Sequence, residues 1–179
     1  MNKILLNGGE IGELGYQDFP ILIHGEDKSG ASLYTVCLAA KWFSQGNKVI
    51  FLCGYPMAQQ AFEEQVGEEH ADATFYTKEK VEEQDFKKAV LGEINADTLL
   101  VIKNVELFGP EEVGWISNFK NIIISGDINK SQAKNEILKR DFTTRVCFSK
   151  FEGIDIPNLA KYEGFMISAG RKGITKIEK

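Results

Sequence analysis

A glycine-bracketed loop constrains the fold of this chain most strongly: Gly25-Glu26-Asp27-Lys28-Ser29-Gly30-Ala31-Ser32. It follows the apolar run 20–24 and precedes a helical pattern, so it predicts a strand, a tight turn and a helix. Its spacing matches G-x-x-x-x-G-K-[ST], in which backbone N–H groups surround phosphates, the lysine reaches the terminal phosphates and the hydroxyl residue binds magnesium. Ala31 stands at the lysine position. The loop therefore indicates a fold more clearly than a reaction.

Short apolar runs alternate with helical patterns along most of the chain, which is typical of βαβ units. We expect strands near 21–24, 48–53, 74–76, 98–102, 121–125 and 144–148, and helices near 32–44, 58–68, 80–91, 110–115 and 131–140. Two more strands, joined by a glycine-flanked turn, are expected within 164–177. The predicted fold class is α/β, with three layers: a mainly parallel sheet flanked by helices, ending in a C-terminal antiparallel β-hairpin. We expect one domain over 1–179.

Composition limits the class of protein and its compartment. Hydrophobic residues at 43% and charged residues at 26% match a soluble globular protein, and no apolar run approaches the roughly 20 residues of a membrane span. A cytoplasmic location is the default expectation. Cys37, Cys53 and Cys147 are widely spaced within apolar segments, so they are interpreted as buried small hydrophobes. Neither histidine is near a cysteine, and we expect no metal site.

The net charge of −5 hides a gradient along the chain. Residues 1–128 carry 10 basic and 20 acidic side chains, whereas residues 129–179 carry 11 and 6. A basic C-terminal third can mark a face for DNA or an acidic partner, whereas charge runs of this kind are usually a solvated, lysine-bearing surface. The overall negative charge disfavours avid non-specific DNA binding. The candidate contacts to phosphates or a partner subunit are Arg140, Arg145, Arg171 and Lys172.

In the order of its strands, glycine loop and closing hairpin, the chain resembles a RecA-like P-loop NTPase. Two stretches are similar to the FtsK/HerA type of DNA-pumping and secretion motors: the proline-led strand 18–25 that enters the loop, and the Thr-Arg-apolar stretch 142–149. The resemblance covers nearly the whole chain. It implies a three-layer α/β fold, a nucleotide at the loop and assembly with other subunits.

The positions that carry chemistry in this family depart from its pattern. Ala31 replaces the phosphate-binding lysine. Lys103-Asn104 follows the strand near 98–102, where the family's Walker B acid would hold the magnesium shell, and Gly54-Tyr55 stands where another acid is expected. Without a metal-bound water or a general base, ATP hydrolysis is not expected, and no catalytic residue is assigned.

The candidate nucleotide contacts all lie in the loop: Gly25, Lys28, Ser29, Gly30 and Ser32. Lys28 would replace the missing cation if it folded back, or else offset its acidic neighbours as a solvent-facing residue. Ser32 suits a helix cap as well as a magnesium ligand. His24, just before the loop, fits a hydrogen-bonded structural histidine better than a catalytic one. Asp127, after the strand near 121–125, would be unfavourable beside a phosphate.

Two hypotheses of function follow. The first is a degenerate RecA-like domain, a pseudo-ATPase that binds protein partners as a regulatory or structural subunit of a motor, recombination or secretion assembly, with no cofactor expected. The second is an unconventional NTPase that binds ATP and magnesium through Lys28 and Ser32 and associates with DNA through its basic third.

Overall fold

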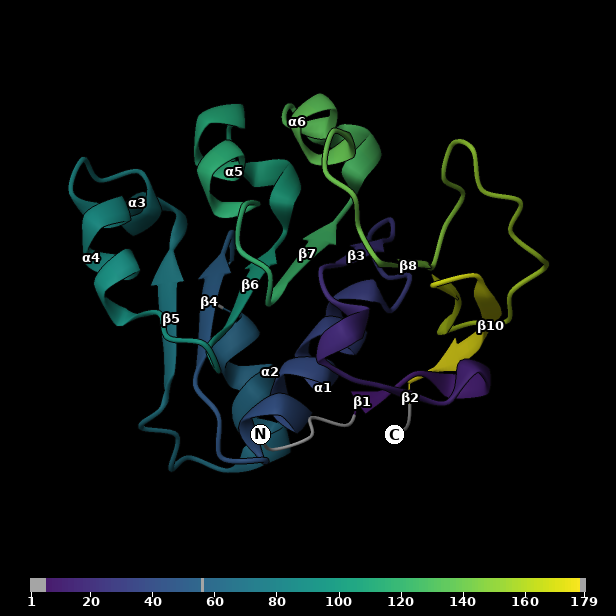
Figure 1. Ribbon diagram of the computed structural model, residues 1–179, viewed down its shortest axis with the longest axis horizontal. Helices are drawn as coiled ribbons and strands as arrows, with labels where there is room; N and C mark the ends of the chain where they lie inside the picture. The colour runs from purple at the N-terminus through teal and green to yellow at the C-terminus, as the bar shows by residue number, and fades with distance from the viewer. Residues whose placement is uncertain (1–5, 56, 178–179) are drawn as a thin grey trace.

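An eight-stranded sheet forms the centre of the computed structural model, which describes residues 6–55 and 57–177 (Figure 1). The strand order is β10-β9-β8-β3-β7-β6-β4-β5. The six strands from β8 to β5 in this order pair in parallel. Their bounds are β3 (Ile21–His24), β4 (Val49–Cys53), β5 (Ala73–Thr77), β6 (Leu99–Lys103), β7 (Ile122–Gly126) and β8 (Thr144–Cys147).

Helices cover both faces of this sheet (Figure 1). One face packs against α1 (Ala31–Phe43) and α2 (Met57–Val66), in a core that contains Trp42, Phe51 and Phe62. The other face carries a second core that includes Ile50, Phe86 and Ile124, covered by α3 (Lys78–Val81), α4 (Phe86–Glu93), α5 (Pro110–Ile116) and α6 (Lys134–Leu138). Because consecutive strand residues face opposite cores, the strands are apolar at successive positions. The three-layer prediction is confirmed.

The predicted C-terminal hairpin is present as β9 (Glu163–Ser168) and β10 (Arg171–Lys176). β9 pairs antiparallel with β8 and so extends the parallel sheet. The outer edge of β10 is covered by the 3₁₀ turn η1 (Gly9–Ile11), where the Ile174 amide donates to Glu10 Oε2 at 2.8 Å. The short strands β1 (Leu6–Asn7) and β2 (Glu13–Leu14) and the turn η2 (Tyr16–Asp18) precede β3 and were not expected.

The helix expected over 80–91 is wrong as a single element, because residues 82–85 interrupt it between α3 and α4. Val81 and Phe86 both pack into the second core. Five residues apart on one straight helix, they would point about 140° away from each other. The break brings both side chains to the same core.

The helix expected over 131–140 is shorter than predicted, since α6 covers only five residues. Ser131 Oγ accepts the Ala133 amide at 3.1 Å and closes the preceding turn. Two 3₁₀ turns complete the elements, η3 (Val105–Leu107) and η4 (Ile128–Lys130). Within 6–55 and 57–177, no helix has the length and apolar character to cross a membrane.

Candidate functional site

The loop between β3 and α1 has the backbone shape of a strand-to-helix turn. Gly25 ends the strand, and its amide donates to the Gly126 carbonyl of β7 at 3.1 Å. A Cβ at Gly25 would lie 2.3 Å from Ser29 Oγ and 2.5 Å from the Ala31 Cβ, so only glycine lets the loop fold back this tightly. Gly30 precedes α1 with a φ of 101°, a left-handed conformation that glycine adopts without strain. Both glycines are required by the turn itself.

Several loop amides already have partners within the protein. The Glu26 amide donates to Ser149 Oγ at 3.0 Å, and the Ser29 amide to the Glu26 carbonyl at 3.1 Å. The Ala31 amide lies 3.4 Å from Ser29 Oγ, a long hydrogen bond. These are the groups that a phosphate-binding loop presents to its ligand. A phosphate would have to displace the side chains of Ser149 and Ser29 to reach them.

The C-terminal part of the chain packs against the end of this loop. A Cβ at Gly30 would lie 2.7 Å from Ile177 Cδ1 and 3.1 Å from a ring carbon of Tyr162. These two residues flank the β9–β10 hairpin, and the Ile177 amide donates to the Tyr162 carbonyl. The hairpin ends therefore close the loop from one side.

Lys28 and Ser32, the two side chains on which a nucleotide site would depend, are exposed. Lys28 occupies the loop tip with a φ of 62°. Ser32 lies in the first turn of α1. Lys28 therefore lies within the loop and Ser32 directly after it, and their contact with a nucleotide stays a prediction.

A buried lysine ends β6, the strand next to β7. Lys103 is 6% exposed, and its ammonium lies 3.3 Å from Asn104 Oδ1. Among the described residues, no carboxylate comes within ion-pair distance of it. Burial lowers the pKa of Lys103, an effect opposed by the nearby Cys53 thiol and Glu106. This end of the strand therefore holds a poorly compensated cation rather than an acid.

The register of the sheet places Lys103 on the face that carries α1. Cys53 is its direct neighbour on β4, and both follow the side chains of the first core, Phe51 and Val101. On β7, Ser125 Oγ accepts a 2.6 Å hydrogen bond from Thr35 of α1. Burial raises the pKa of the Cys53 thiol to about 12, so it stays protonated at neutral pH.

The end of β4 is closed by packing. The Gly54 amide donates to the Lys103 carbonyl at 3.2 Å. A Cβ at Gly54 would lie 2.4 Å from Leu107 Cδ1. The position where the sequence comparison expects an acid is therefore filled by a neighbouring apolar side chain, and any side chain there requires Leu107 to move.

Two acidic residues lie at the end of β7: Asp127, which follows the strand, and Glu106, which contacts the Asp127 backbone. The Asp127 amide donates to Glu106 Oε2 at 3.1 Å. Asp127 is 6% exposed; its Oδ2 lies 3.7 Å from Lys130, and its Oδ1 is buried without a hydrogen-bond partner among the described residues. These groups add negative charge to the edge where a nucleotide would lie. No group of three or more potential metal-ligating side chains occurs in the described part of the chain.

His24 has a structural arrangement of hydrogen bonds. Its Nδ1 accepts the Ile128 amide at 3.1 Å, and its Nε2 lies 3.1 Å from the Lys150 carbonyl. Because Nδ1 is an acceptor, the neutral tautomer with a proton on Nε2 satisfies both bonds. Burial lowers the pKa of His24, although Asp127 and the Lys150 carbonyl oppose this shift. The histidine joins the ends of β3, β7 and β8.

We expect His24 to make the protein less stable as the pH falls below about 6.5, the ordinary histidine pKa. Its folded pKa is depressed, so the unfolded chain binds the proton first, and the free energy of unfolding decreases towards acid. Urea unfolding at pH 7.5, 6.5 and 5.5 measures this slope. His24→Asn, which keeps an acceptor but does not titrate, should flatten it, whereas His70→Asn serves as the control. An unchanged slope in His24→Asn would contradict the assignment.

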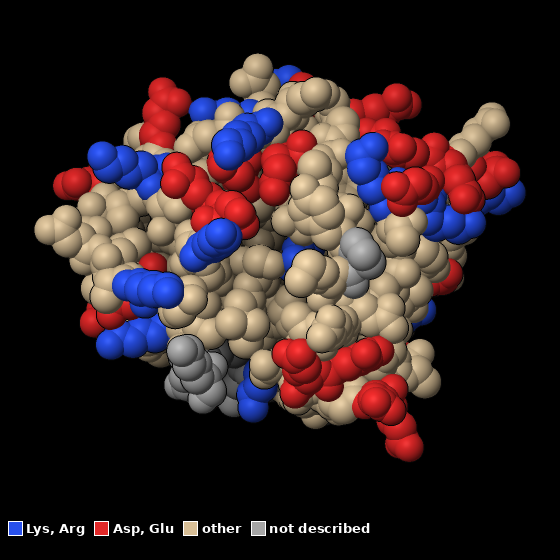
Figure 2. Space-filling model, turned by 180° about the vertical axis from the view of Figure 1, so that it is seen from behind, with Lys and Arg blue, Asp and Glu red and all other residues tan. Residues whose placement is uncertain are grey.

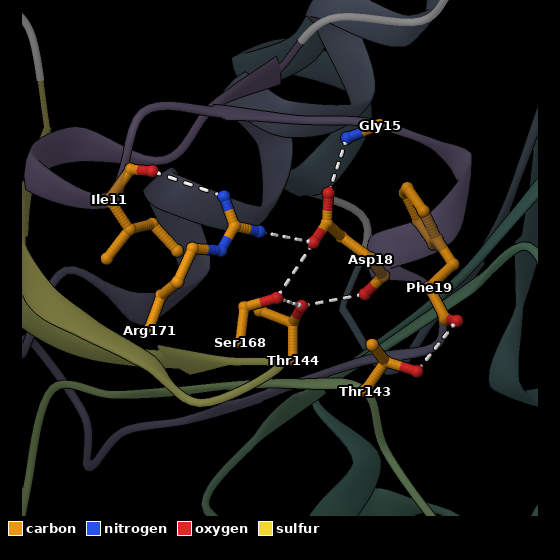
Figure 3. Close-up of polar contacts among 8 residues, drawn as sticks. All are labelled: Ile11, Gly15, Asp18, Phe19, Thr143, Thr144, Ser168 and Arg171. Carbon is orange, nitrogen blue, oxygen red and sulfur yellow. Dashed lines mark hydrogen bonds and ion pairs between the residues drawn. The ribbon is translucent and has the colours of Figure 1, made fainter.

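Two of the basic candidates are engaged inside the protein. Arg171 donates to Asp18 Oδ1 at 2.7 Å and to the Ile11 carbonyl at 3.3 Å (Figure 3). Arg140 donates to the Phe119 carbonyl at 2.5 Å, and burial lowers its pKa. Arg145 is half-buried on β8, and Lys172 is exposed on β10. The register of β8, β9 and β10 places Arg145 and Lys172 on one face of the sheet, two strands apart, and Arg171 on the other face. Contact of the four residues with a partner stays a prediction.

The sheet order, the glycine loop at the end of β3 and the helix that follows define an α/β fold of the P-loop NTPase type. No family model and no curated protein matches the chain. The cytoplasmic domain of EssC has a similar structure, with a TM-score of 0.60 and 12% identity, over 94% of this chain and 41% of that one.

Two structures of EccC from Thermomonospora curvata are also similar. The cytoplasmic domain of this type VII secretion ATPase has a TM-score of 0.62 and 12% identity, over 99% of this chain and 26% of that chain. ATPases 2 and 3 of EccC in complex with a signal sequence peptide have a TM-score of 0.62 and 11% identity, over 99% and 40%. The chain spans less than half of each of these proteins. At such identities the similarity establishes the fold.

Sequence reasoning missed the buried contacts that surround the loop. It did not identify Ser149, Tyr162 and Ile177 as neighbours of the loop, and it did not identify Asp18 as the partner of Arg171. Polar and apolar side chains so far apart in the chain carry no local pattern that reveals their partners.

Proposed function

We propose that this protein is a catalytically degenerate P-loop domain, of the RecA-like and FtsK/HerA-related type, that acts by binding protein partners rather than by hydrolysing ATP. Its place would be that of a regulatory or structural subunit of a larger motor, recombination or secretion assembly. Among these, the structural similarity to secretion ATPases favours a secretion assembly.

The observation that carries this proposal is Lys103, buried at the end of β6. In a P-loop NTPase this strand end supplies the acid that helps to hold magnesium. An ammonium group repels the metal instead, and the nearest acid in sequence, Glu106, accepts the Asp127 amide. Mg²⁺ prefers oxygen ligands such as carboxylates, and this strand end presents the ammonium of Lys103 in place of one.

Two other features support the same proposal. Ala31 presents a methyl group where the phosphate-binding lysine would be, and the loop end at Gly30 is packed against Ile177 and Tyr162. These residues do not fit a magnesium nucleotide, so no reaction step is assigned to one. Loss of one such electrostatic group commonly costs about 100- to 1,000-fold in rate.

We expect no heat in titration calorimetry with ATP and magnesium, and no shift of the thermal unfolding midpoint, at nucleotide concentrations up to about 1 mM. Lys28→Ala and Ser32→Ala should behave like the wild type in both assays. ATP turnover above background that Ser32→Ala abolishes, or magnesium-dependent binding that Lys28→Ala removes, would establish the alternative NTPase. A salt-sensitive mobility shift of duplex DNA would support its association with DNA.

A further inference from the structure

A pocket opens at the carboxyl end of β4 and β5. In the sheet, β7 and β6 separate these two strands from β3, the strand that leads into the glycine loop. The pocket has a volume of about 350 Å³, and its walls include Tyr55, Phe75, Tyr76, Thr77 and Glu79. Tyr55 is 52% exposed at the rim. Cys53, Gly54 and Gln59 complete the lining, which therefore combines aromatic, small and polar residues with one carboxylate.

Glu79 has no ion-pair partner among the residues that the structure describes, although two lysines flank it in sequence. Lys78 pairs with Glu82 and Lys80 with Glu83, so both neighbouring cations are engaged elsewhere.

The Phe75 and Tyr76 rings turn into opposite cores, where Phe75 stacks on Phe51 and Tyr76 meets Phe86, so Tyr55 is the exposed ring at the pocket. A carboxylate near an exposed ring suits an alkylammonium or guanidinium group, which binds the ring face and pairs with the carboxylate. The pocket therefore matches a lysine or arginine side chain.

The pocket adjoins an open sheet edge. β5 is the outermost strand, and within the described residues no strand pairs with its outer side. The Val49 amide donates to the Asp72 carbonyl. In a parallel pair the backbone N–H and C=O groups of alternate residues point to the same side, so those of Thr74 and Tyr76 point towards β4 and those of Phe75 point outward. An extended segment can add to this edge through main-chain hydrogen bonds.

The charge around β5 selects the kind of segment that fits. Five acids precede the amino end of β5, at the opposite end of the strand from the pocket: Glu63, Glu64, Glu68, Glu69 and Asp72. On the face seen in Figure 2, acidic side chains gather at the lower right, whereas both signs of charge are interspersed at the upper right. A second copy of this chain would bring the same acids against each other, so a basic partner is favoured over self-pairing.

We infer that the β5 edge and its pocket bind an extended basic segment of a partner protein, with one arginine or lysine side chain in the pocket beside Glu79. This site lies apart from the glycine loop and is independent of whether ATP binds there. ATP hydrolysis would overturn the proposed function and leave this inference standing. Failure of the peptide test below would overturn this inference and leave the proposed function standing.

The test uses the full chain, labelled with ¹⁵N, and a capped pentapeptide of threonine, valine, arginine, valine and threonine as the probe. We expect NMR shift changes at Tyr55, Phe75 and Thr77, and slowed exchange of the Phe75 amide proton. Glu79→Gln should weaken binding about tenfold, the loss of one charge-assisted contact. Replacing the peptide's arginine with citrulline should weaken it similarly, with little further loss in Glu79→Gln.

Glu111→Gln is the matched control, because Glu111 is an exposed acid in the first turn of α5 that does not line the pocket. It should leave peptide binding unchanged. The inference is overturned if no residue of the pocket shifts at about 1 mM peptide, which corresponds to binding too weak for a specific contact. It is also overturned if Glu111→Gln weakens binding as much as Glu79→Gln, or if the protein dimerises through β5 in sedimentation experiments.

Discussion

Asp18→Ala is expected to lower the free energy of unfolding by about 3–5 kcal/mol, because it removes a buried acceptor of three hydrogen bonds, one of them from the half-exposed Arg171. The Asp18 side chain is 1% exposed. Its carboxylate accepts the Gly15 amide at 2.7 Å, the Ser168 hydroxyl at 2.9 Å and Arg171 Nη2 at 2.7 Å (Figure 3). The substitution leaves these donors without their acceptor. Urea unfolding followed by circular dichroism measures the loss.

Two further variants separate the ion pair from the rest of this network. Arg171→Ala leaves the buried carboxylate without its cation, so the double variant with Asp18→Ala should be less destabilised than the sum of the two single effects. Lys172→Ala, at the exposed neighbouring position, should change stability by less than about 0.5 kcal/mol. An Asp18→Ala protein within about 1 kcal/mol of the wild type would contradict the role assigned to the carboxylate.

Trp42→Ala is expected to cost about 3–5 kcal/mol, since it removes a fully buried aromatic side chain and leaves a cavity. Trp42 is 0% exposed at the end of α1, and its ring meets the edges or faces of Tyr16 and Phe19 at centroid distances of 5.3 Å. Its Nε1 donates to the Asp97 carbonyl at 3.0 Å. Urea unfolding by circular dichroism is again the measurement, because the substitution removes a fluorophore.

Trp115→Ala provides the comparison for this second substitution. Trp115 is partly exposed and lies 6.2 Å from Phe86, centroid to centroid, so its loss should cost about half as much or less. Equal losses of stability in the two variants would contradict this expectation, because they would show that the contacts of Trp42 with the segment before β3 do not contribute to stability.

The sheet and the loop were predictable because their signals are local. The six parallel strands lie within one or two residues of the expected ranges, since buried strands are apolar at successive positions and helices separate them. The turn roles of Gly25 and Gly30 were also predictable from the sequence. Gly25 has no room for a Cβ, and Gly30 has a left-handed backbone conformation that other residues rarely adopt. Residues 82–85 were not recognised as a helix break, because that break depends on which core Val81 and Phe86 reach.

The candidate site was only partly predictable. The sequence indicated that Ala31 and Lys103-Asn104 differ from a nucleotide site, but it did not indicate that Lys103 is buried without a carboxylate partner. Nor did it indicate that Ile177 and Tyr162 pack against Gly30. Burial and counter-ions depend on neighbouring strands, and strand order is not encoded in any one segment.

The sequence by itself determined the α/β class, the strand-to-helix turn at the glycine loop and the absence of the loop lysine, because each depends on residues within a few positions of one another. Only the tertiary structure decided what the charged side chains do. Arg171 looked like a surface contact in a basic third, yet it pairs with Asp18, 153 positions away. The strand order brings β10 and the segment before β3 together, so the arginine meets a buried carboxylate that no nearby position in the chain supplies.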